Sequence, residues 1–151
     1  MTHHQPIGQL RAVLTGEARP YTRPGTRSGI HKQPQSGSVA AGPLGLAGDE
    51  QGDLRVHGGP DKAVHCYAWS HYVHWRAALP LTAADLLLQP GASGENFSMD
   101  GLAEDQVCIG DQWQVGTARF EVSQGRQPCW KLNDRFGVGD MGRQVQDGGR
   151  A

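Results

Sequence analysis

One cysteine has neighbours that would make its thiol reactive. Cys129 follows Pro128 and lies three residues after Arg126. Pro128 suits the first turn of a helix, because this turn leaves backbone N–H groups unpaired and proline has none. A helix start and a nearby guanidinium both favour the thiolate, which is the form that attacks electrophiles and binds metals. The alternative for Cys129 is a buried structural cysteine, the commonest fate of an unpaired thiol.

A glycine-rich segment with two histidines is the second candidate. Residues 57–65 read His-Gly-Gly-Pro-Asp-Lys-Ala-Val-His. Gly58-Gly59-Pro60 predicts a tight turn with open backbone N–H groups, which a ligand can approach closely. Lys62 would add a point charge for an anion, while His57 and His65 flank the turn. The two histidines could also form a zinc pair, although a full set of four ligands is not evident. The alternative is a surface turn without a ligand.

The turn Gly94-Glu95-Asn96 is the third candidate. It would present one carboxylate that accepts hydrogen bonds and one amide that both donates and accepts them. None of the three candidates is decisive alone.

Composition bounds the kind of protein that carries these residues. The chain has 151 residues, 37% of them hydrophobic, with 22 glycines and a net charge of −1. We expect one turn-rich domain over residues 1–151, and this charge does not argue for a nucleic acid or a membrane surface. The 3 cysteines form no C-x-x-C pair, which fits neither a disulfide scaffold nor a zinc ribbon. Cys66 and Cys108 lack the surroundings of Cys129 and are expected to be structural. The chain shows no signal peptide at its start and no apolar run of ~20 residues, so we expect a reducing cytoplasm.

Short elements must position the candidates, and most of them are strands. Alternating residues and turn-forming glycines predict strands over 9–14, 38–40, 44–46, 63–67, 96–98, 106–109, 113–115 and 118–122. Helical spacing predicts helices over 68–79, over 83–88 with Thr82 as the cap, and from Cys129 to about Phe136. Residues 19–37 are basic and predict a solvated loop or an extended hairpin, and the polar end predicts no regular element. This pattern indicates a mainly β or α+β domain.

Taken together, the motifs resemble those of the MOSC domain, named for the C-terminal domain of the molybdenum cofactor sulfurase. The resemblance runs from about residue 10 to about residue 146. It rests on G-L-x-G-D-x-Q-x-D from Gly45, H-G-G-P-D-K-A-V-H-x-Y from His57, G-E-N from Gly94, I-G-D from Ile109 and S-Q-x-R-x-P-C from Ser123. The motif at His57 is specific to the stand-alone bacterial MOSC proteins, which the chain resembles most.

This resemblance implies a MOSC-type β-barrel with a few short helices and a pocket for the molybdenum cofactor (molybdopterin), whereas pyridoxal phosphate is not expected. In one implied role, the Cys129 thiolate ligates molybdenum, and the metal reduces N-hydroxylated bases, hydroxylamines or amidoximes to amines. In the other role, Cys129 carries sulfur as a persulfide for delivery to metal centres. A soft thiolate suits a molybdenum centre.

The resemblance also implies roles for the residues around Cys129. Arg126 and Lys62 would hold the pterin phosphate, and the glycine turns would supply backbone donors. His57 and His65 would orient the pterin or move protons to the leaving oxygen. The residues expected at the cofactor are Lys62, Gly58, Gly59, Gly94, Glu95, Asn96, Gln124 and Arg126, and the expected catalytic residues are Cys129, Arg126, His57 and His65.

The chain departs from the family pattern at its C-terminal end. MOSC proteins usually continue beyond the segment that resembles residues 137–149 into a G-W-Y-x-R-V strand and a G-x-V-x-x-G-D turn, which this sequence lacks. A barrel without its last strands would expose an edge. The expectation is therefore a truncated domain, or a homodimer in which another protomer completes the sheet.

Three hypotheses stay open. The first is a molybdenum-dependent reductase of a small N-hydroxylated substrate. The sequence contains no iron–sulfur motif or dinucleotide fingerprint, so the electrons would come from an electron-donor protein. The second is a sulfur carrier or cofactor-transfer module, and the third is a degenerate domain without catalysis.

Overall fold

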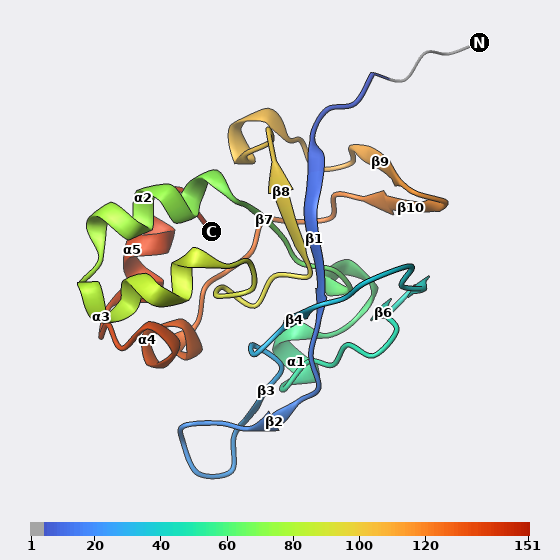
Figure 1. The fold of residues 1–151 in the computed structure, drawn as a ribbon. Helices are drawn as coiled ribbons and strands as arrows, with labels where there is room; N and C mark the ends of the chain where they lie inside the picture. Colours follow the sequence, from blue (N-terminus) through green and yellow to red (C-terminus); the bar gives the residue numbers. More distant parts are fainter. Residues whose placement is uncertain (1–4) are drawn as a thin grey trace.

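A four-stranded sheet lies at the centre of the computed structural model, which describes residues 5–151 (Figure 1). Its order is β4-β1-β8-β7, made of Gln33–Pro34, Gln9–Thr15, Phe97–Asp100 and Cys66–Ala68. β1 is antiparallel to β4 and β8, whereas β7 is parallel to β8. The strands predicted at 9–14 and 96–98 are confirmed, and the one predicted at 63–67 begins later. The start of the chain, where we expect no signal peptide, lies partly outside the described residues.

A layer of helices gathers on one side of this sheet (Figure 1). Two parallel strands need a long crossover connection. Between β7 and β8 it consists of α2 (Ser70–Ala78), α3 (Leu81–Ala84) and the 3-10 helix η2 (Asp85–Leu88). The later helices α4 (Trp130–Phe136) and α5 (Met141–Asp147) join the same layer. The core of the layer includes Tyr72, Trp75, Leu87, Phe136 and Met141, all buried.

Three hairpins complete the described strands. They are β2–β3 (Arg19–Pro20 and Arg27–Ser28), β5–β6 (Ala41–Gly42 and Gly45–Leu46) and β9–β10 (Gln112–Val115 and Ala118–Glu121). Phe120 of β10 stacks edge-on against Phe97 of β8, with ring centroids 5.3 Å apart, and so joins the hairpin to a second core cluster. The α+β class is confirmed. The strands of residues 5–151 do not close into the expected barrel, because β7 and β10 each have a partner on only one side.

Two predictions between residues 80 and 110 are wrong, because they followed local sequence signals that the structure does not obey. Thr82 does not cap a helix, because α3 already begins at Leu81 behind Pro80. The strand predicted at 106–109 is absent, because Gln106 ends the 3-10 helix η3 (Glu104–Gln106) and a turn follows. In this turn, Asp111 Oδ2 accepts the Cys108 N–H at 2.9 Å. Cys108 is exposed there, so the expectation of a structural cysteine is wrong.

The polar C-terminal segment forms a helix that its composition does not predict. α5 buries only Met141 and Val145, which are four residues apart and therefore on one face. Docking against α4 stabilises this helix. Within residues 5–151, no helix has the length and apolar character that a membrane crossing would need.

Candidate functional site

Cys129 is the N-cap residue of α4, with an extended backbone at φ −128° and ψ 174°. Its carbonyl accepts the Leu132 N–H at 3.1 Å, which is the first hydrogen bond of the helix. The helix predicted after Cys129 is confirmed, but Pro128 precedes the cap instead of lying in the first turn. Cys129 is half-buried.

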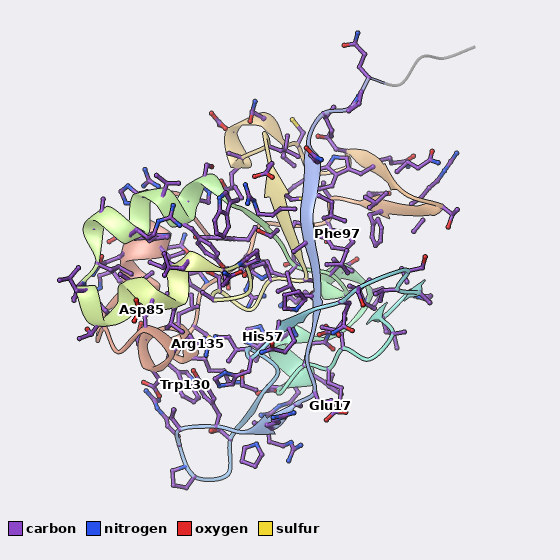
Figure 2. The ribbon with its side chains drawn as sticks, in the orientation of Figure 1. Glu17, His57, Asp85, Phe97, Trp130 and Arg135 are labelled. Carbon is purple, nitrogen blue, oxygen red and sulfur yellow. The ribbon has the colours of Figure 1, made fainter. Side chains whose placement is uncertain are left out.

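The β2–β3 hairpin holds α4 in place from outside. Tyr21 Oη donates to the Lys131 carbonyl at 2.9 Å, and Lys131 Nζ donates to the Arg27 carbonyl at 2.6 Å. The Arg23 guanidinium lies 3.9 Å from the centre of the Trp130 ring, close enough for a cation–π contact. Figure 2 labels Trp130 at the start of α4. These contacts show that the basic 19–37 segment is an extended hairpin at its start, and that it fixes the residues next to Cys129.

Two cavities meet beside this thiol. A small one of about 60 Å³ is lined by Cys129 and by the predicted residues Gly94 and Asn96. A larger groove of about 1100 Å³ runs along β7 and the β9–β10 hairpin. Four side chains line both cavities: His57, Lys62, His65 and Arg126. The structure therefore brings together the cysteine, the arginine, the lysine and both histidines that the sequence indicated.

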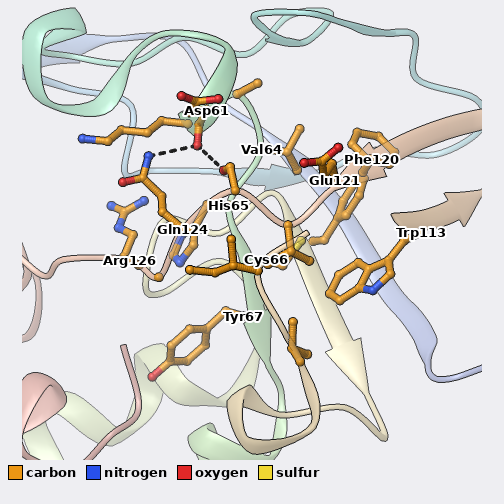
Figure 3. Close-up of a pocket in the computed structure, with 18 of the residues that line it drawn as sticks. Asp61, Val64, His65, Cys66, Tyr67, Trp113, Phe120, Glu121, Gln124 and Arg126 are labelled. Atoms are coloured by element: carbon orange, nitrogen blue, oxygen red, sulfur yellow. Dashed lines mark hydrogen bonds between the residues drawn. The ribbon is translucent and has the colours of Figure 1, made fainter. Parts of the chain in front are cut away.

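Neither ring nitrogen of His65 reaches solvent and neither makes a hydrogen bond of normal geometry, although a Gly94 backbone group lies close enough to oppose the lowering of its pKa. Figure 3 shows its ring beside Arg126. Burial lowers the pKa of His65 well below 6.5, and the charge of Arg126 lowers it further. Buried polar atoms without a partner are rare in folded proteins. An ordered water or a polar ligand at this position would supply the missing partners.

His57 is also a neutral imidazole at pH 7. Burial lowers its pKa to about 4, with further contributions from the charges of Arg126, Lys131 and Lys62. It ends the short helix α1 (Leu54–His57), whose first turn is capped by Asp53 accepting the Arg55 N–H at 3.1 Å. A cavity wall with several cations and two neutral imidazoles is suited to an anion.

Arg126 provides the partly buried cation next to the thiol. Burial lowers its pKa, and negative charges on Cys129 and Glu95 oppose that effect. An arginine keeps its proton even so. Arg126 and Cys129 line the same small cavity, so the structure brings the guanidinium and the thiol to one site.

Lys32 and Asp49 form a buried ion pair in the small cavity that the sequence reading did not single out. Lys32 Nζ lies 2.7 Å from Asp49 Oδ1, and the two side chains are only 6% and 1% exposed. Asp49 Oδ1 also accepts the Gly16 N–H at 3.0 Å, whereas Asp49 Oδ2 is buried without a partner. In the sequence, Lys32 is one of several cations of the basic 19–37 segment, and Asp49 is the first aspartate of the G-L-x-G-D-x-Q-x-D motif. Nothing local distinguishes a buried pair that is 17 residues apart.

Glu95 belongs to the interior of the fold instead of lining either cavity. It is 0% exposed and accepts the Tyr72 hydroxyl at 2.5 Å, the Gly91 N–H at 2.6 Å and the Ser93 N–H at 3.2 Å. Burial raises its pKa despite these donors. Its role is to shape the turn that presents Gly94, where φ is +78° and an added Cβ would lie 3.0 Å from Ile30 Cγ1.

Asn96 fixes the backbone around the site. Its Oδ1 accepts the His65 N–H at 3.0 Å, and its Nδ2 donates to the Leu14 carbonyl at 3.1 Å. Both polar atoms of the amide are thus used within the protein. Asn96 lines the small cavity but acts mainly by holding His65 against β1.

The remaining predicted residues lie at the rim. Lys62 is exposed and its Nζ donates to the Val56 carbonyl at 2.6 Å, while Gln124 Nε2 donates to the Asp61 carbonyl at 3.1 Å (Figure 3). Gln124 lines only the larger groove. Gly58 and Gly59 do not line either cavity; they form the tight turn before the 3-10 helix η1 (Pro60–Lys62), with Gly59 at φ +98°.

Within the described residues, His57 and His65 belong to no group of three or more possible metal ligands, so a zinc pair gains no support.

A match to a known protein family identifies the fold. The family model described as the MOSC domain matches residues 53–151. The chain belongs to the MOSC domain family. His57, Lys62, His65, Arg126 and Cys129 lie inside the matched region. Lys32 and Asp49 lie before it, so the site of this MOSC domain is assembled from both sides of the boundary.

Curated relatives of this MOSC domain are longer than the chain. It is 42% identical over 138 residues to the protein YiiM of Escherichia coli (strain K12), covering 91% of this chain and 60% of that protein. It is 44% identical over 124 residues to the uncharacterized protein YflK of Bacillus subtilis (strain 168), covering 81% and 53%. A protein named reductase from Gibberella moniliformis (strain M3125 / FGSC 7600) is 42% identical over 110 residues, which are 72% of this chain and 19% of that protein.

Solved structures share the same fold. The crystal structure of YiiM from Escherichia coli has a TM-score of 0.74 and 33% identity, covering 97% of this chain and 60% of that one. YiiM from Geobacillus stearothermophilus has a TM-score of 0.71 and 31% identity, covering 95% and 64%. The chain thus spans somewhat less than two thirds of the structures that it resembles.

Proposed function

We propose that this MOSC domain binds the molybdenum cofactor beside Cys129 and reduces N-hydroxylated compounds to amines. One observation carries the proposal. Cys129 lines a cavity of about 60 Å³ together with Arg126 and the buried His65 ring, and these two side chains also line the groove of about 1100 Å³, which has the volume for a pterin. A thiolate, a cation and unused polar atoms together fit a ligand that contains a soft metal and an anionic group.

The residues present fit the parts of this cofactor. The Cys129 thiolate would ligate molybdenum, because soft sulfur ligands suit such a metal. Arg126, Lys62 and Lys32 would hold the pterin phosphate, and His57 and His65 would hydrogen-bond the pterin through neutral imidazoles. When bound, the cofactor would supply the two-electron redox chemistry that these side chains lack.

The chain's own residues would manage charge and protons during the reaction. Reduction of an N-hydroxy group to an amine consumes two electrons and two protons and releases water, and an electron-donor protein would supply the electrons. Lys32 Nζ lies in the cavity wall, 2.7 Å from Asp49 Oδ1. Since the pKa of His57 is about 4, its imidazole would pass protons only between neutral tautomers near pH 7.

The name of one relative is consistent with this class of chemistry. The printed name of the Gibberella moniliformis protein is reductase, and it shares 42% identity with the chain over 110 residues. The reduction of hydroxylamines, amidoximes or hydroxylated purine bases by this chain is the proposal that this similarity motivates. Action in the cytoplasm is part of the same proposal.

Metal and pterin analysis of two cysteine variants tests the proposal. The protein is produced in a host that makes the cofactor, and molybdenum is measured by mass spectrometry together with pterin fluorescence. Cys129→Ser should lose both signals, whereas Cys108→Ser should keep them, because Cys108 is exposed and lines neither cavity. Full molybdenum and pterin in Cys129→Ser would overturn the proposal.

The same thiol offers the alternative function of a sulfur carrier. Cys129 is partly exposed and electrostatically coupled to Arg126, as a persulfide site would also require. Incubation with a cysteine desulfurase, followed by cyanide treatment, would release thiocyanate from a persulfide. Thiocyanate from the wild type but not from Cys129→Ser, in protein that never takes up molybdenum, would favour the carrier. The absence of both molybdenum and thiocyanate would indicate a domain without catalysis.

A further inference from the structure

An exposed basic surface lies on the β2–β3 hairpin, which contacts α4. Arg19, Arg23 and Arg27 are exposed there, and residues 19–37 contain no acidic residue, although the whole chain has a net charge of −1. Glu17 is the nearest acidic residue before the hairpin. Among the described residues, Arg19 and Arg27 take part in no ion pair. A surface whose charge is unbalanced attracts and orients partners of the opposite sign.

The helix α4 adds a further cation to this surface. Arg135 is half-buried, and its Nη1 lies 2.8 Å from His31 Nδ1, with no carboxylate of residues 5–151 at ion-pair distance. Burial lowers the pKa of His31, and the charges of Arg135 and Arg19 lower it further, so these three groups lie near one another. The acid of this helix, Asp134, is matched by Arg23, whose Nε lies 3.8 Å from Asp134 Oδ2. The basic surface thus consists of Arg19, Arg23, Arg27, His31 and Arg135.

Aromatic rings join the basic surface to the thiol. Trp130 directly follows Cys129, and the Arg23 guanidinium lies 3.9 Å from the centre of the Trp130 ring. The centres of the Tyr21 and Trp130 rings are 5.9 Å apart. Burial raises the pKa of Tyr21, and Cys129 is among the charged groups that contribute, so this ring also lies near the thiol. Because Trp130 and Tyr21 line neither cavity, a protein bound over them would not have to enter either one.

We propose that the basic surface docks the acidic face of a small electron-carrier protein of the ferredoxin or flavodoxin type, an inference that rests on the proposed function. For each N-hydroxy group that is reduced, the carrier gives up two electrons in one or two encounters, and the site takes up two protons and releases an amine and water. Electrostatic attraction raises the rate of encounter more than the stability of the complex, which suits a carrier that must leave after each transfer.

The size of the surface and the charge of the chain favour this partner. Electron-transfer complexes have small interfaces, so a hairpin and the start of one helix are sufficient. A nucleic acid would also be attracted by arginines. The net charge of −1 on the whole chain disfavours that alternative, because the rest of the chain would repel the extended negative charge of the nucleic acid.

Binding of two acidic carriers to matched charge-reversal variants tests this inference. The probes are a plant-type ferredoxin and a flavodoxin, each titrated by calorimetry into the cofactor-free 151-residue chain at about 0.05 M and about 0.5 M salt. Arg19→Glu should weaken binding by about tenfold or more at the lower salt, and the higher salt should weaken binding of the wild type. Arg119→Glu makes the same change of charge on β10, which lies apart from the β2–β3 hairpin in Figure 1, and should bind as the wild type does.

Steady-state kinetics of the protein loaded with cofactor separate docking from chemistry. With reduced ferredoxin as donor and an aromatic amidoxime as substrate, Arg19→Glu should raise the KM for ferredoxin by about tenfold and leave kcat near that of the wild type, since the change affects the encounter. With reduced methyl viologen, a small donor that needs no docking surface, both variants should match the wild type.

Three outcomes would overturn the inference. They are equal losses of binding in Arg19→Glu and Arg119→Glu, the absence of salt-dependent binding to either carrier, and tighter binding of a single-stranded oligonucleotide than of both carriers, which would assign the surface to nucleic acid. Failure of the proposed function is seen separately, as the absence of molybdenum and pterin, because the calorimetric experiment does not need the cofactor.

Discussion

Asp49→Asn is expected to be among the most damaging single substitutions near the site. The pair with Lys32 is 2.7 Å long, and its side chains are only 6% and 1% exposed. Removing one member of a buried pair leaves the other charge uncompensated and costs about 3–5 kcal/mol. The small cavity beside Lys32 is lined partly by polar groups, which places the expected loss near the lower end, about 3 kcal/mol. With an m-value of about 2 kcal/mol/M, the midpoint of urea unfolding would fall by about 1.5 M.

A double-mutant cycle identifies the ion pair as the cause. Lys32→Met alone leaves the Asp49 carboxylate with only the Gly16 N–H as partner, at 3.0 Å. The double variant Lys32→Met/Asp49→Asn removes both charges, so its loss of unfolding free energy should fall short of the summed single losses by about 1.5 kcal/mol or more.

An exposed ion pair provides the control for this cycle. Arg11 Nη2 and Asp100 Oδ1 are 3.0 Å apart, and their side chains are 40% and 35% exposed. Asp100→Asn should therefore cost no more than about 1 kcal/mol. Additive losses in the cycle, or an Asp49→Asn loss no larger than that of Asp100→Asn, would refute the reasoning.

Two further substitutions test the titrating groups. The pKa of His57 is lowered to about 4, so the folded state binds fewer protons than the unfolded state and loses stability as pH falls from 6.5 toward 4. The melting temperature of His57→Gln should therefore fall less than that of the wild type between pH 7 and pH 5; an equal fall would contradict this. Burial raises the pKa of Glu95, so its contribution is full at low pH and declines as pH rises through that pKa. Glu95→Gln should cost about 1–3 kcal/mol in urea unfolding, and less at pH 8 than at pH 5; a cost that grows with pH would exclude this account.

Most elements near the site could be predicted because their signals are local. The alternation in 9–14 and the helical spacing after Cys129 each depend on a few consecutive residues, and the structure has β1 and α4 there. α5 could not be predicted in this way, since a polar helix with two buried residues is stabilised by packing against α4. The burial of Lys32 and the interior position of Glu95 also depend on partners distant in sequence, Asp49 and Tyr72.

The topology of the central sheet explains why separated segments form one site. Parallel strands begin at the same edge of a sheet, and His65 directly precedes β7 as Asn96 directly precedes β8. β1 is antiparallel to β8 and ends at this edge, where its partner β4 begins just after Lys32. The positions of His65, Asn96 and Lys32 at the small cavity therefore follow from the strand order alone. Cys129 reaches them only through α4 and the hairpin that holds it, so substitutions in the hairpin should move the thiol and leave His65 and Lys32 in place.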